Sequence, residues 1–164
     1  MSIFNKNLPD NFKVSLMQGQ RYIAEFNKQA FLKLLEFDCF SKNFSKRVTE
    51  EVNKDIYSEL FLEVDKCEDA ASELRKDLIS LYRIEIDIEK DQKPITVCSS
   101  VFGEILYSND IFSNDFLTEI FNVARDVQAE KKLVDKNSTI ESGTISATRN
   151  YKNIKITAST SRYS

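Results

Sequence analysis

Three acidic residues spaced two apart, Glu85, Asp87 and Glu89, are the most suggestive group of chemically capable side chains in this sequence. Side chains two positions apart on a strand point to the same face, and a row of carboxylates offers the oxygen ligands that hard divalent cations prefer. The same row is typical of a solvated strand face, because Asp and Glu are mostly exposed. We predict a solvated face and no metal site. A divalent-metal-dependent enzyme that uses these carboxylates is the alternative.

The sequence has few of the residues that other kinds of catalytic site need. The chain has no histidine and three glycines in 164 residues, which removes imidazole bases, Ser-His and Cys-His pairs, ordinary zinc sites and glycine-rich phosphate loops. Ser99 and Ser100 supply hydroxyls without a base to activate them. We therefore predict no catalytic residue and no cofactor, and a protein that is not an enzyme.

The last 27 residues differ in composition from the rest, since eleven of them are Ser or Thr. Isoleucines punctuate this segment, and the pattern predicts a polar β-hairpin with strands at 144–148 and 154–158 and a turn at Arg149-Asn150. A hairpin this polar is typical of a sheet edge or of an arm that seeks a partner. The alternative is a disordered tail.

This segment also supplies the candidate interaction residues. Residues 142–164 hold four basic and no acidic residues, while residues 49–93 hold seven basic against fourteen acidic. We expect the hairpin to dock by strand addition on the same or a neighbouring copy or on another protein. The candidate residues are Ile145, Arg149, Lys152, Ile154, Lys155, Ile156 and Arg162. With Tyr151 and Tyr163 the basic residues could also engage phosphates, so a nucleic-acid-binding accessory is a further alternative. No recognised nucleic-acid motif is present, and we expect no such partner.

Composition places the chain among folded proteins. It is 41% hydrophobic and 30% charged, with a net charge of −3, and it lacks both a run of membrane-span length and an N-terminal segment of signal-peptide type. Three widely spaced cysteines, Cys39, Cys67 and Cys98, fit buried thiols in a reducing compartment. We expect no membrane contact and a cytoplasmic location, in a cell or in the host of a virus.

In the N-terminal half, the spacing of apolar residues predicts one helix and leaves a second segment ambiguous. Residues 18–36 carry Tyr22, Ile23, Phe26, Ala30, Phe31 and Leu34 at helical spacing, which predicts a helix. Residues 37–77 fit two periods at once. Val48, Val52, Ile56, Leu60 and Val64 are four apart, as in a helix, while Leu60, Leu62 and Val64 alternate as in a strand. The segment 68–77 is rich in helix formers.

The second half is clearer. Tyr82, Ile84, Ile86 and Ile88 alternate with charged residues, which predicts a strand with one buried face. A turn at 91–94 then leads to a strand over 95–107, and the two strands should form an antiparallel hairpin. Ser113 or Asn114 should cap a helix whose buried stripe is Leu117, Ile120, Phe121, Ala124 and Val127.

A strand from Ile56 to Asp65, a long strand from Leu78 to Lys90, another from Pro94 to Tyr107 and then a helix resemble, in order and length, the SecB family of export chaperones. The resemblance covers about half the chain and rests on this pattern, without a shared motif. It implies a tetrameric protein that holds unfolded polypeptides.

Together these patterns predict an α+β fold, in which an antiparallel sheet packs against helices, with an N-terminal helix and a polar C-terminal hairpin. We expect a single core domain at 1–137 and a hairpin or arm at 138–164. The predicted function is protein interaction or assembly, as a small acidic holdase-like chaperone or a subunit of a larger assembly, cellular or viral. The expected partner is another protein or a second copy.

Overall fold

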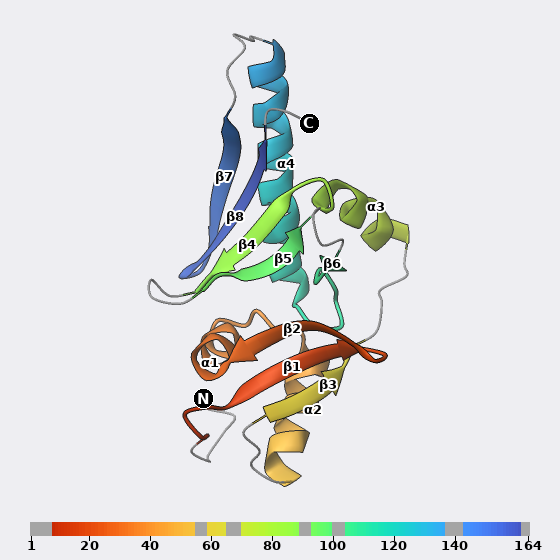
Figure 1. Ribbon diagram of the computed structural model, residues 1–164, viewed down its shortest axis with the longest axis vertical. Coiled ribbons are helices and arrows are strands. Elements are labelled where there is room, and N and C mark those ends of the chain that lie inside the picture. Colours follow the sequence, from red (N-terminus) through yellow and green to blue (C-terminus); the bar gives the residue numbers. More distant parts are fainter. Residues whose placement is uncertain are drawn as a thin grey trace. The chain divides into compact units, whose positions relative to one another are not determined.

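The computed structural model describes residues 8–54, 59–64, 70–88, 93–99, 104–136 and 143–161. It confirms the predicted α+β class, with two sheets and four helices among these residues. The chain forms two compact units (Figure 1). Unit 1 comprises Met1–Cys67 and Ser108–Phe116, and unit 2 comprises Glu68–Tyr107 and Leu117–Ser164. Each unit is thus built from two separate stretches of sequence.

Unit 1 contains a three-stranded sheet in the order β2-β1-β3. Strands β1 (Lys13–Gln18) and β2 (Arg21–Asn27) are antiparallel, and β3 (Glu59–Glu63) runs parallel to β1. Gln18 pairs with Arg21, so Gly19 and Gln20 form a two-residue turn, and the φ of 64° at Gly19 is one that glycine adopts without strain.

The predicted helix over 18–36 is therefore wrong in its first half. Residues 21–27 form β2, and only α1 (Lys28–Glu36) is helical. Its N-cap is Asn27, whose side chain accepts a hydrogen bond of 2.8 Å from the amide of Ala30. Leu16 pairs with Ala24 and Met17 with Tyr22, so the register shifts by one residue in β2. This shift interrupts the alternation of a regular strand, and the apolar residues before the cap therefore resemble a helical pattern.

The ambiguous segment contains both kinds of element. Helix α2 (Lys42–Lys54) buries Val48 and Val52, and β3 buries Leu60 and Leu62. Helix α3 (Ala70–Ile79) follows, as the composition of 68–77 indicates. The two periods thus belong to consecutive elements, and Ile56, which links them in the helical pattern, lies outside the described residues.

Phenylalanine rings form the core of unit 1. Phe40 is the central ring, with centroids 4.8 Å from Phe44, 5.6 Å from Phe31 and 5.7 Å from Phe26. The ring of Phe112 stacks on Phe40 at 6.3 Å, and their backbones form an isolated antiparallel bridge. Residues 108–116 therefore supply part of the core of a unit whose other residues precede position 68.

Unit 2 contains a five-stranded sheet in the order β6-β5-β4-β8-β7. Strands β4 (Arg83–Asp87) and β5 (Ile95–Ser99) pair antiparallel, as predicted, and Tyr82, Ile84, Ile86 and Ile88 are buried. The predicted strand over 95–107 is too long. It divides into β5 and the short β6 (Glu104–Ile105), which folds back antiparallel on β5.

Helix α4 (Asn114–Lys136) runs along one face of this sheet (Figure 1). The hydroxyl of Ser113 accepts a hydrogen bond of 3.3 Å from the amide of Phe116, which confirms the predicted cap. The predicted stripe is buried except for Phe121, which is half-buried, with the guanidinium groups of Arg75 and Arg125 at 5.1 and 5.9 Å from its ring centroid.

The C-terminal hairpin consists of β7 (Thr144–Tyr151) and β8 (Ile154–Ser161). Its turn lies at Lys152-Asn153, three residues after the predicted one, and Lys152 has a φ of 54°. Strand β8 pairs antiparallel with β4 from Lys155 to Ser159, so the hairpin belongs to the sheet. We expected a hairpin or arm at 138–164, and the described residues 144–161 form a hairpin. Deleting it would remove an inner strand of the sheet.

Candidate interaction surfaces

The carboxylate row lies on the face of β4 that points away from the buried isoleucines. Glu85 is 3.0 Å from the guanidinium of Arg83, and Asp87 lies directly opposite Lys155 on β8. Glu89 lies outside the described residues. No group of three or more His, Cys, Asp or Glu side chains that could hold a metal ion occurs in the described part of the chain. Glu85 thus has an ion pair with Arg83, and Asp87 has a cationic residue directly across on β8, as is common on a solvated strand face.

We expect Mg²⁺, Mn²⁺ and Ca²⁺ to leave the thermal unfolding midpoint unchanged, because a ligand bound only by the folded state must raise it. The control is the triple variant Glu85→Ala/Asp87→Ala/Glu89→Ala, which should respond in the same way. A rise in the midpoint of the natural protein that the triple variant lacks would support the metal-enzyme alternative instead.

The apolar candidate residues of the C-terminal hairpin are buried inside unit 2. Ile145, Ile154 and Ile156 belong to its core together with Ala158. In register, Ile156 faces Ile86 of β4 and Ala158 faces Ile84. The hairpin thus pairs with the chain's own sheet, and its isoleucines extend the buried face that Ile84 and Ile86 form.

The basic candidate residues do not form one patch. Arg149 binds helix α4, with its Nε 2.6 Å from Oδ2 of Asp126 and its Nη1 3.7 Å from Glu119. The hydrogen bond to Asp126 is the main cause that raises the pKa of Arg149 above its ordinary value. Lys152 and Lys155 are exposed, and the ammonium of Lys152 lies 5.6 Å from the ring of Tyr151. Arg162 lies outside the described residues.

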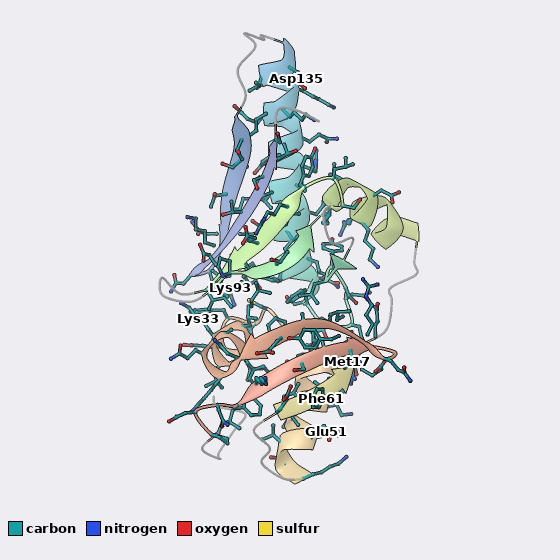
Figure 2. All side chains as sticks on the ribbon, in the orientation of Figure 1. Met17, Lys33, Glu51, Phe61, Lys93 and Asp135 are labelled. Carbon is teal, nitrogen blue, oxygen red and sulfur yellow. The ribbon has the colours of Figure 1, made fainter. Side chains whose placement is uncertain are left out.

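Unit 1 presents a surface that the sequence analysis did not identify. The face of its sheet opposite the phenylalanine core carries Met17, Tyr22 and Phe61, which we call the unit 1 sheet face. Met17 pairs in register with Tyr22, and Ser15, two residues before Met17, pairs with Phe61. Phe61 is 64% exposed and Tyr22 is 49% exposed. Figure 2 labels Met17 and Phe61 on the neighbouring strands β1 and β3.

Charged side chains surround the unit 1 sheet face. The ammonium of Lys13 lies 3.7 Å from Glu25 and 3.8 Å from Glu59, and the buried hydroxyl of Ser15 donates to Glu59 at 2.9 Å. Glu63, opposite Met17, accepts a hydrogen bond from the amide of Gly19. With three glutamates against one lysine, the surroundings of this face are acidic.

The hydroxyl of Tyr22 belongs to the same network, since it donates to Glu25 at 2.9 Å. Partial burial, then the hydrogen bond and the negative charge of Glu25, raise the pKa of Tyr22 to about 12. The hydrogen bond to Glu25 restrains the hydroxyl of Tyr22, and with it the ring, on this face. A held aromatic ring loses little conformational entropy when a partner covers it.

The sequence did contain a signal for Phe61. Leu60, Leu62 and Val64 are buried, so Phe61 must lie on the other side of the strand with Glu59 and Glu63. A large aromatic residue between two glutamates on a solvated face is unusual enough to mark a contact site. The sequence could not show that Met17 and Tyr22 lie beside it, because the β1–β3 pairing joins residues more than forty positions apart.

Comparison with models of protein families, with curated proteins and with solved structures gave no match for this chain. No helix among the residues that the structure describes is long and apolar enough to cross a membrane.

Proposed function

We propose that this protein works by binding extended segments of other polypeptides, as a non-catalytic holdase-like or assembly protein. The observation that carries the proposal is the unit 1 sheet face, where Phe61, Tyr22 and Met17 gather on one side of a small sheet. Apolar groups gathered on a surface and rimmed by polar residues mark interaction sites on soluble proteins.

The chemistry of the rim suggests the kind of segment bound. Glu25, Glu59 and Glu63 favour a partner with basic side chains, and Phe61 and Tyr22 favour one with aromatic or aliphatic side chains. An extended segment with both kinds of residue is typical of an unfolded chain. The resemblance to SecB-like chaperones suggests the same kind of client, although the three strands that carry it lie in two different sheets here.

The test is binding of labelled unstructured peptides, followed by fluorescence anisotropy. Peptides that combine aromatic and basic residues should bind, and peptides of the same length with acidic residues in place of basic ones should bind more weakly. Phe61→Ser should raise the dissociation constant by about tenfold or more, as expected for an aromatic anchor.

Leu133→Ser is the matched control, because Leu133 is a similarly exposed apolar residue, at 56%, on α4 in unit 2. It should leave the dissociation constant unchanged. Equal affinity for basic and acidic peptides, or equal loss in the two variants, would contradict the proposed site.

A further inference from the structure

The edges of the two sheets differ in how they are protected. Among the described strands, β2 and β3 end the unit 1 sheet, and β6 and β7 end the unit 2 sheet. An edge strand presents a row of unpaired backbone groups that can pair with another chain. Proteins commonly prevent this with short strands, bulges or charged side chains.

Three of the four edges carry such protection. Strand β6 is two residues long. Strand β3 has five residues with a glutamate at each end. Strand β2 begins at Arg21, carries Glu25, and pairs with β1 in a register that is irregular at Leu16/Met17. These features make all three edges poor templates for a further strand.

Strand β7 is neither short nor irregularly paired. It has eight residues in unbroken register with β8, from Thr144 opposite Ser161 to Tyr151 opposite Ile154. It contains no proline and no lysine. Its one charged side chain, Arg149, points to α4, where Asp126 binds it. Nothing in β7 itself prevents another strand from pairing with it.

The register also indicates which backbone groups face outward. The pair that closes a two-residue turn, here Tyr151 and Ile154, exchanges both of its hydrogen bonds, and bonded and non-bonded pairs alternate from there. The residues whose N–H and C=O groups point away from β8 are therefore every second one. These are Thr144, Ser146, Thr148 and Asn150, all with exposed side chains.

We propose that β7 pairs antiparallel with β7 of a second copy of this chain, which joins two five-stranded sheets into one. The strand is complementary to itself under a two-fold axis. Its outward residues are small, polar and uncharged, so hydroxyl and amide side chains face their own kind, and Thr–Thr and Thr–Ser pairs stabilise antiparallel sheets. No like charges meet, because Asp126 neutralises Arg149. This inference uses unit 2 and does not depend on the proposed function of unit 1.

The main experiment is sedimentation of the full chain from low micromolar to several hundred micromolar concentration. The natural protein should pass from monomer to dimer. Ser146→Lys/Thr148→Lys brings lysines of the two copies together and should raise the dimer dissociation constant by about tenfold or more. The matched control is Thr157→Lys/Ser159→Lys, which changes the direct cross-strand partners on the inner strand β8, and it should dimerise as the natural protein does.

Hydrogen exchange of the natural protein tests the same contact without any variant that could fail to fold. The amides of Thr144, Ser146, Thr148 and Asn150 should exchange rapidly in dilute solution and slowly in concentrated solution, while the amides that face β8 stay protected throughout. A chain that remains monomeric over the whole range would overturn the inference. So would a dimer that resists the β7 lysines, or whose alternate β7 amides gain no protection.

Discussion

Replacing Ile86 with aspartate should strongly destabilise the sheet of unit 2. Ile86 is fully buried in β4, with Ile95 of β5 on one side and Ile156 of β8 on the other. An aspartate there would place a carboxylate without a partner in the apolar core, at a cost of about 4 kcal/mol or more. That is a large share of the roughly 5–15 kcal/mol that stabilises a typical domain. Urea unfolding followed by circular dichroism measures the change.

Asp87→Ala is the control, because Asp87 is the next residue of the same strand and points to the other face. It should change the free energy of unfolding by no more than about 0.5 kcal/mol. Equal losses in the two variants would mean that the faces of β4 are assigned wrongly.

The second large effect is expected at Phe112, in the segment that returns to unit 1. Its buried ring stacks on Phe40 and lies 5.2 Å from the ring of Phe116. Phe112→Ala should leave a cavity and cost about 3–5 kcal/mol. Hydrogen exchange should show the loss in β1, β2 and β3, while the amides of β4 and β8 keep their protection.

Leu32→Ala is the matched control for this prediction, since Leu32 lies on α1 in the same unit and its side chain is exposed. It should have little effect on exchange in the unit 1 sheet. If β1 stayed equally protected in Phe112→Ala and in Leu32→Ala, residues 108–116 would not be part of the unit 1 core.

The sequence predicted elements well where one period belonged to one element. Ile84, Ile86 and Ile88 alternate without interruption because β4 has one buried and one solvated face. It misled at residues 21–27, where the register irregularity near Met17 gives Tyr22, Ile23 and Phe26 a helical spacing. The glycine at position 19 was the available local signal, since its positive φ forms the turn between β1 and β2.

The candidate surfaces were harder to predict because they depend on which distant segments pair. Ile154 and Ile156 were expected to contact a partner, yet they are buried, because β8 lies between β4 and β7. The alternation of residues within β8 cannot show which strands lie beside it. Phe61 was visible as an aromatic residue among alternating leucines. Phe61 becomes part of a larger surface only through the parallel pairing of β1 with β3, which brings Met17 near it.

The division of each unit between two stretches of sequence has a consequence for synthesis. A growing chain that has just completed β3 contains Phe31, Phe40 and Phe44 but not Phe112, so its aromatic core still lacks a ring. Unit 2 lacks its inner strand until β8 has been made. Each unit therefore reaches its native packing only after its second stretch has been made, and until then the nascent chain exposes apolar surface that is itself prone to aggregate or to engage chaperones.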